Sequence, residues 1–141
     1  MRKGVTLPEL VMVLVIIGVM LAMALPRLSG WLDWLAVDRA AQDIAAFHNT
    51  ARFTAILRGQ RVRLDFSVDS LRATLEGPTD SVFLSWPGPG RLGVRLTASR
   101  PTIRFWPNGV GLGADTKLVL RRGAAAESLT TSLLGRLKRW P

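Results

Sequence analysis

The stretch GVTLPELVMVLVIIGVMLAMALP, residues 4–26, decides the fold of this chain. From Leu10 to Leu25 every residue is apolar apart from Gly18. As an α-helix, the segment from Val5 to Leu25 would be roughly 31 Å long at 1.5 Å per residue. That length matches the hydrocarbon core of a bilayer, which is roughly 30 Å thick. The sequence therefore predicts one membrane-spanning helix near the amino terminus.

Charged residues at the start of the chain predict its orientation in the membrane and the need for a cation that pairs with Glu9. Arg2 and Lys3 precede the apolar run, which favours a cytoplasmic amino terminus and an exported carboxyl-terminal domain. Glu9 lies inside the edge of the predicted membrane helix, and a carboxylate there costs about 2.5–3.5 kcal/mol at the helix centre and less near its end. The next basic residue is Arg27, so the cation that pairs with Glu9 must come from outside this helix. A free α-amine on a neighbouring subunit would serve if the chain were cut just before Val5.

Gly4, followed by VTLPEL and a long apolar helix, resembles the class III signal of type IV prepilins and type II secretion pseudopilins. The resemblance implies that a prepilin peptidase cleaves between Gly4 and Val5 and methylates the amine of Val5. It also implies that Glu9 pairs with the terminal amine of an adjoining subunit during assembly. Pro26 stands where many members of the family have a helix-kinking proline. Valine at position 5 departs from the phenylalanine that is commoner there.

Two other interpretations of the amino terminus compete with this one. A conventional secretory signal could be cleaved near Ala22-Met23-Ala24, giving a mature chain that starts near Leu25. Glu9 at the start of its apolar region and Pro26 beside the cleavage point argue against that signal. A plain membrane anchor would explain the apolar run but neither Gly4 nor Glu9.

Beyond the anchor, the pattern predicts an α+β domain. Apolar residues recur at three-to-four spacing over about 29–57, which predicts a helix continuous with the anchor, and Gly59 ends it. After Gly59 the period becomes two, which predicts antiparallel strands that the helix packs against. We expect a leader at 1–4, a transmembrane and assembly helix at 5–28, and an exported pilin-like domain at 29–141. Within that domain we expect a β-rich part at 60–134 and a basic tail at 135–141. Strands are predicted near residues 62–66, 71–75, 82–84, 92–96, 102–106, 117–120 and 128–134.

Composition argues against an enzyme. The chain has no cysteine, so thiol nucleophiles, disulfides and zinc–thiolate sites are excluded. Its single histidine, His48, has no second histidine or cysteine with which to share a metal, and a structural role is favoured. The glycines at 109, 111 and 113 lack the helix and lysine of a nucleotide-binding loop. We expect no catalytic residues, no metal and no cofactor.

Motifs in the domain carry a second resemblance, to the H-type minor pseudopilins and T-type minor fimbrial pilins. Ala51-Arg52 with Arg58-Gly59-Gln60 is similar to their helix-to-strand passage. Phe105 with Pro107-Asn108-Gly109 resembles their F-x-P-x-G segment, and Gly135-Arg136 their terminal element. The resemblance implies a non-enzymatic filament subunit in the bacterial inner membrane, whose partners are the prepilin peptidase and other pilins. Two destinations stay open: a type II secretion pseudopilus, or a type IV pilus that the subunit primes or equips to capture DNA.

The balance of 19 Lys+Arg against 10 Asp+Glu gives a net charge of +9, which attracts anions. The tail Gly135-Arg136-Leu137-Lys138-Arg139-Trp140 combines cations with an aromatic ring, a combination suited to phosphate contacts and base stacking. In the T-type minor pilins a similar element is associated with DNA binding. Arg136, Lys138 and Arg139 are therefore candidate DNA ligands. A solvated terminus, or a surface for an acidic neighbour, is the alternative.

Overall fold

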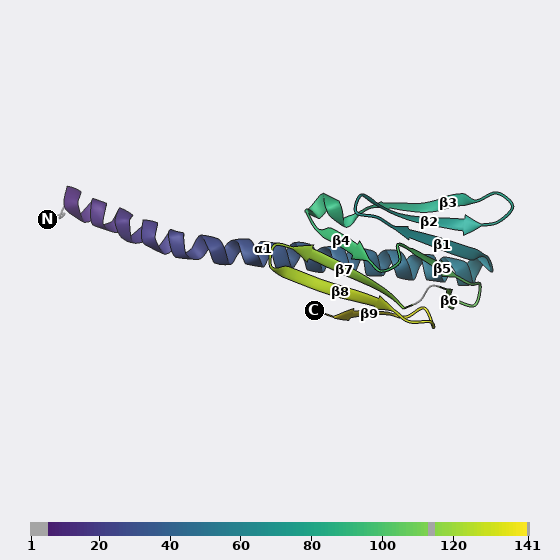
Figure 1. Cartoon of the computed structure of the whole chain (residues 1–141). Helices are drawn as coiled ribbons and strands as arrows, with labels where there is room; N and C mark the ends of the chain where they lie inside the picture. The colour runs from purple at the N-terminus through teal and green to yellow at the C-terminus, as the bar shows by residue number, and fades with distance from the viewer. Residues whose placement is uncertain (1–5, 113–114, 141) are drawn as a thin grey trace. The chain divides into compact units, whose positions relative to one another are not determined.

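The computed structural model describes residues 6–112 and 115–140, and of residues 24–27 it describes the backbone only. Within these residues, one long helix, α1 (Leu7–Arg58), comes first, and nine strands follow it (Figure 1). The carbonyl of Thr6 accepts the first two backbone hydrogen bonds, from Glu9 and Leu10. Gly59 ends the helix in a left-handed conformation with φ +60°, which costs glycine little. The predicted continuous helix and its end are thereby confirmed.

Two units make up the chain, Met1–Leu32 and Asp33–Pro141. The second contains two antiparallel sheets (Figure 1). The first sheet has the order β3-β2-β1-β5-β6. Its strands are β1 (Arg61–Phe66), β2 (Ser70–Glu76), β3 (Ser81–Pro87), β5 (Thr102–Phe105) and β6 (Gly111–Leu112). The second sheet has the order β4-β7-β8-β9. Its strands are β4 (Arg95–Ala98), β7 (Thr116–Arg122), β8 (Ala125–Thr131) and β9 (Leu137–Trp140).

One core joins α1 to both sheets within the Asp33–Pro141 unit. The helix contributes buried side chains at three-to-four spacing, among them Val37, Ile44 and Phe47. Alternate residues of the strands complete the cluster from the other side, as their period of two requires. The buried strand side chains include Val62, Leu64, Ile103, Phe105, Leu118, Leu120 and Leu129. The predicted α+β class, a helix packed on antiparallel sheet, is confirmed.

Three local expectations were wrong. Residues 92–96 form no single strand: a 3-10 turn, η1 (Pro89–Leu92), comes first, and β4 begins at Arg95 after Gly93 at φ +67°. Residues 128–134 do not continue as a strand past Thr131, because Leu133 and Leu134 form an exposed turn that ends at Gly135, φ +71°. The part beyond 134, expected as a tail, contains β9, which pairs with β8. Its short alternating pattern was hidden by the high density of charge.

Candidate functional site

In the amino-terminal unit, the apolar side chains described between residues 10 and 23 are all exposed. By length and composition, the helical part of this unit is long and apolar enough to cross a membrane. Glu9, in the first turn of α1, is exposed, and no ion pair joins it to another described residue. A lone carboxylate at the edge of a lipid-facing helix has to be satisfied from elsewhere. Among the described residues, neither the exposed apolar side chains of this segment nor Glu9 has a partner.

Several predicted residues of the amino terminus lie outside the described structure. Gly4 and Val5 belong to the undescribed residues, and the side chain of Pro26 is not described. The cleavage site, the methylated amine and the proline position stay predictions.

In the domain, Arg52 connects three of the motifs that the sequence shows separately. Its Nε donates to the carbonyl oxygen of Gly109 at 3.0 Å, and its Nη2 donates to that of Leu134 at 3.2 Å. The end of α1, the Pro107-Asn108-Gly109 turn and the Leu134-Gly135 turn are thus joined through one guanidinium. Each motif is visible in the sequence, but their contact through Arg52 is not, because the three lie far apart along the chain.

Gly135 occupies the tightest point of this junction. A Cβ at that position would lie 2.5 Å from the carbonyl oxygen of Gly109 and 2.8 Å from Nε of Arg52. With φ at +71° as well, only glycine fits without displacing its neighbours. The terminal Gly-Arg element therefore has a packing role at Gly135 itself.

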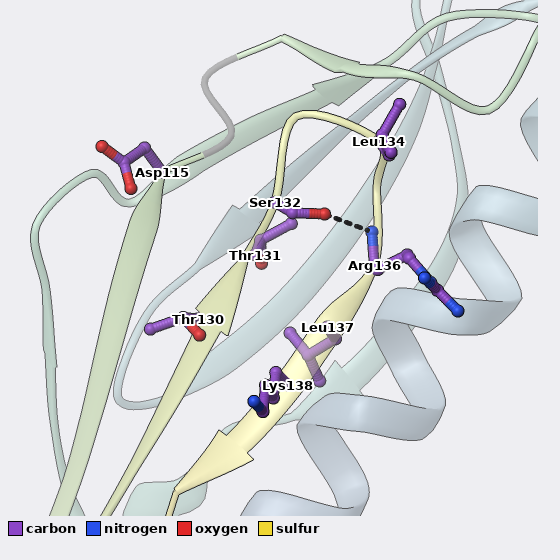
Figure 2. A pocket seen from close by; sticks show the side chains of 8 residues that line it. All are labelled: Asp115, Thr130, Thr131, Ser132, Leu134, Arg136, Leu137 and Lys138. Atoms are coloured by element: carbon purple, nitrogen blue, oxygen red, sulfur yellow. Dashed lines mark hydrogen bonds between the residues drawn. The ribbon is translucent and has the colours of Figure 1, made fainter.

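The three candidate DNA ligands separate in space, because β9 alternates its side chains. Arg136 lies before the strand; its backbone N–H donates to Oγ of Ser132 at 3.2 Å and its side chain is exposed (Figure 2). Lys138 is exposed, with Nζ 3.9 Å from the ring centroid of Trp140. Arg136 and Lys138 help to line an open hollow of about 620 Å³ over the β8–β9 hairpin (Figure 2).

Arg139 points the other way, into an ion-pair network beneath the sheet. Its guanidinium donates to both carboxylate oxygens of Glu127, at 2.6 and 3.0 Å, and to Asp38 of α1 at 2.5 Å. The Glu127 side chain is only 8% exposed. Hydrogen bonding to Glu127 raises the pKa of Arg139 above its usual range. Arg139 thus ties β9 to β8 and to the helix, a role that its place in a charged segment did not reveal.

Most carboxylates of the domain are neutralised by arginine. Asp33 pairs with Arg122 at 2.9 Å and Asp43 with Arg91 at 2.7 Å. On the first sheet, Arg63 forms ion pairs with three carboxylates, those of Asp65, Glu76 and Asp80, and Arg104 forms one with Glu76. The unpaired charge that remains at the domain surface is therefore chiefly positive.

His48 is a buried structural residue. It is fully buried, and its ring lies edge-on to Phe105 with 5.0 Å between centroids. Neither ring nitrogen has a hydrogen-bond partner among the described residues. Burial lowers the pKa of His48 to about 4, so the ring is neutral at ordinary pH. In the described part of the chain, no cluster of three or more His, Cys, Asp or Glu residues could hold a metal.

Comparison with known proteins identifies the class. A family model described as "Type II transport protein GspH" matches residues 40–135, and one described as "Prokaryotic N-terminal methylation motif" matches residues 1–25. Because the first model covers more than half of the chain, this protein belongs to the GspH family. It is a minor pilin-like or pseudopilin-like protein, and that family and fold are those of structural proteins.

Individual relatives and structures agree with this class. The chain is 48% identical over 63 residues to the pilin-like protein PilA1 of Thermus thermophilus, covering 45% of this chain and 39% of that one. It is 31% identical over 99 residues to a fimbrial protein of Pseudomonas aeruginosa, covering 70% and 62%. The chain therefore spans less than two thirds of either relative. The type IV minor pilin FimU of P. aeruginosa shares the fold, with a TM-score of 0.65, 14% identity and coverage of 74% of this chain and 88% of that one.

Proposed function

We propose that this chain is a minor pseudopilin, a structural subunit of the short filament of a type II secretion system. The observation that carries the proposal is the combination of an exposed, membrane-length apolar helix with a domain that fits the GspH model over residues 40–135. In a filament, the apolar helices of neighbouring subunits would pack against each other, and the domain would form the filament's surface.

Processing is the first step of the proposal. A prepilin peptidase cleaves between Gly4 and Val5 and methylates the new amine, which the match of residues 1–25 to the methylation motif supports. Residues 1–4 are then a leader, 5–28 the transmembrane and assembly helix, and 29–141 the exported domain. Arg2 and Lys3 hold the amino terminus in the cytoplasm, so the chain crosses the inner membrane once with its domain in the periplasm.

Assembly is the second step. In the filament, the carboxylate of Glu9 pairs with the terminal amine of a neighbouring subunit, because no basic residue lies between Glu9 and Arg27 in its own helix. The cost of a carboxylate in lipid then acts as a register signal, since it is relieved only where the two groups meet. Pro26 loosens the helix at the exit from the membrane, because proline lacks the N–H of the helical hydrogen bond.

Glu9→Ala tests the assembly step, with Asp69→Ala as a matched control that removes an exposed carboxylate from the domain. Both variants are expected in the membrane fraction at the normal level. Glu9→Ala alone should fail to cross-link to other filament subunits. Normal cross-linking of Glu9→Ala would exclude the role. Mass spectrometry of the amino terminus tests processing, and any start other than N-methylated Val5 would contradict the assigned site.

A second candidate is a minor subunit of a type IV pilus, which the FimU fold and the names of the two relatives favour. Deleting the gene separates the two functions. Loss of secreted folded proteins with normal surface pili supports the secretion pseudopilus. Loss of pili with normal secretion supports the type IV pilus and refutes the first proposal.

A further inference from the structure

One corner of the second sheet gathers three arginines around a hollow. Arg95 begins β4, and Arg121 and Arg122 end β7. The register pairs Arg95 directly with Arg121 across the two strands. Together with Gly93 and Gly123, the three arginines line an open hollow of about 390 Å³. We call Arg95, Arg121 and Arg122 the arginine corner.

Arg122 is the neutralised member of the arginine corner. Its Nε lies 2.9 Å from Oδ1 of Asp33, and its Nη1 donates to the carbonyl oxygen of Leu92 at 2.5 Å. The turn after β7 lies against the same carboxylate, because a Cβ at Gly123 would clash with Oδ2 of Asp33. These contacts fix the arginine corner to Asp33 at the start of the domain.

Arg95 and Arg121 carry a charge that the domain does not compensate. Both side chains are exposed, and neither forms an ion pair with another described residue. Like charges directly opposite each other in a sheet are destabilising. An anion seated between the two guanidinium groups would relieve this repulsion.

The first sheet shows how the domain compensates an equivalent pair of arginines. Arg63 and Arg104 are direct cross-strand partners there, in the register of β1 with β5. Oε1 of Glu76 lies 3.7 Å from Nη1 of Arg63 and 3.0 Å from Nε of Arg104. The second sheet repeats the arginine pair without the carboxylate and has a hollow beside it. The comparison indicates that the arginine corner takes its anion from outside the domain.

The arginine corner lies at the end of the domain where the chain enters it. Arg122 pairs with Asp33, which is the first residue of the second unit. Asp33 follows Leu25, the end of the apolar run, by eight residues, which is roughly 12 Å of helix at 1.5 Å per residue. Lipid head groups extend roughly 5–7 Å beyond the hydrocarbon core on each side of a bilayer. A long arginine side chain can cover the remaining distance.

Exposed tryptophans occur at the same level of the chain. Trp34 directly follows Asp33 and Trp31 comes two residues before it, and each tryptophan is 55% exposed. Indole rings favour the head-group level of a membrane. Under the membrane orientation of the proposed function, on which this inference rests, Asp33 and the arginine corner would therefore lie level with the head groups.

We propose that the arginine corner binds the phosphate of an anionic phospholipid in the periplasmic leaflet, with Arg95 and Arg121 as the ligands. A guanidinium presents a planar fork of N–H donors that matches the oxygens of a phosphate. Two uncompensated cations favour a head group with a net negative charge, such as phosphatidylglycerol, over a zwitterionic one. Because the anchor of the same chain holds the domain beside the membrane, the head groups are present at a high effective concentration. The contact holds the domain against the membrane before assembly, and extraction into a filament breaks it.

The test follows the domain in nanodiscs that hold one full chain each, so that filament assembly plays no part. Because the chain has no cysteine, Ala124→Cys in the turn after β7 accepts a single donor dye, and an acceptor dye is linked to a few lipids. Energy transfer from position 124 should rise when phosphatidylglycerol replaces part of the phosphatidylcholine. Each arginine near an anionic surface contributes about fivefold, so the docking equilibrium should shift by about 25-fold.

A second labelling position verifies that the rise is local. Thr79→Cys lies in the turn between β2 and β3, just after Glu76, which pairs with Arg61 near the carboxyl-terminal end of α1. Energy transfer from position 79 should not rise with phosphatidylglycerol, because this turn lies at the opposite end of the domain from Asp33.

Substitution of the two ligands should abolish the effect. Arg95→Ala/Arg121→Ala is expected to show no rise with phosphatidylglycerol. The matched control Lys117→Ala/Arg136→Ala removes two exposed cations from the opposite end of the same sheet and should keep the rise. Circular dichroism melts verify that each variant is folded, and Arg95→Gln/Arg121→Gln replaces the alanine pair if that pair does not fold.

Four results would overturn the proposal. Two are an equal loss of the rise in both pairs and a wild-type chain that does not respond to phosphatidylglycerol. Loss of the rise in sodium phosphate, but not in sodium chloride of the same ionic strength, would assign the arginine corner to free phosphate. Competition by polyglutamate would assign it to an acidic protein.

The membrane orientation is tested separately, in spheroplasts that carry the Ala124→Cys chain. Labelling by a membrane-impermeant maleimide shows that the domain has reached the periplasm. A labelled chain without the lipid-dependent rise refutes the arginine corner alone. A chain that is not labelled refutes the orientation in the proposed function and, with it, this inference.

Discussion

Gly135→Ala probes the junction through which Arg52 joins three turns of the chain. The new methyl group would lie 2.5 Å from the carbonyl oxygen of Gly109, 2.8 Å from Nε of Arg52 and 3.2 Å from Cε1 of Phe105. Two of these neighbours cannot move freely, because the contact at Gly109 is its backbone carbonyl oxygen and Phe105 is buried in the core. Relief therefore requires the turn itself to shift, which breaks the hydrogen bonds from Arg52.

The size of the effect has two parts. A non-glycine residue in the left-handed region costs about 1 kcal/mol. Displacing the turn adds the loss of the Arg52 hydrogen bonds, about 1–2 kcal/mol together. The total is about 2–3 kcal/mol. Gly93→Ala is the matched control, because Gly93 has φ +67° but its nearest contact would be the side chain of Arg122 at 3.7 Å. It should lose only the conformational part, about 1 kcal/mol.

Thermal unfolding of the full chain in a non-ionic detergent, followed by tryptophan fluorescence and circular dichroism, measures both variants. A loss of 1 kcal/mol lowers Tm by roughly 4–8 °C in a domain of this size. Gly135→Ala should therefore melt about 10–15 °C below the wild type and Gly93→Ala about 5 °C below it. Equal shifts for the two would refute the tight junction and leave Gly135 as an ordinary turn residue.

Three further outcomes are expected. Arg139→Ala should destabilise the domain by about 1–3 kcal/mol, which is less than the loss of a fully buried pair because the Arg139 side chain is 35% exposed. Arg136→Ala, the control, should stay within about 0.5 kcal/mol of the wild type. Similar urea midpoints for the two variants would contradict the ion-pair network. Because burial lowers the folded pKa of His48 to about 4 while the unfolded value is 6.5, stability is intact above pH 6.5 and falls as the unfolded chain takes up the proton, by about 2 kcal/mol from pH 7 to 5. His48→Leu should remove that part of the pH dependence, and an unchanged urea midpoint profile would exclude His48 as its source. Phe105→Leu should remove the edge-on ring contact with His48 and lower the free energy of unfolding by about 1 kcal/mol. The same urea titration measures this loss, and an unchanged midpoint would contradict it.

The long helix and its apolar first part could be predicted from the sequence because both depend on local patterns of residues. An apolar run of membrane length and a three-to-four repeat are properties of neighbouring residues, and Gly59 marks the end of the helix by its own conformational freedom. The alternation of β1 and β2 is equally local. These elements appeared with bounds close to those expected.

The site was harder to predict because its contacts join distant residues. Leu133 and Leu134 extended the apolar pattern of β8 although they form an exposed turn, which concealed β9. Once β9 is paired, its alternation directs Lys138 outward and Arg139 inward, and that choice depends on Asp38, which lies 101 residues away. The sequence of residues 135–140 alone does not indicate that Lys138 and Arg139 lie on opposite faces of the sheet.

The same long-range contact has a consequence for how the chain is made. Asp38 leaves the ribosome 101 residues before Arg139, an interval of about 5–20 s at 5–20 residues per second. Throughout that time the apolar stripe of α1 is already synthesised, while the strand that completes the second sheet does not yet exist. The ion pair between Asp38 and Arg139 therefore forms only after Arg139 has been synthesised, and until then the apolar stripe of α1 is open to contacts with other chains.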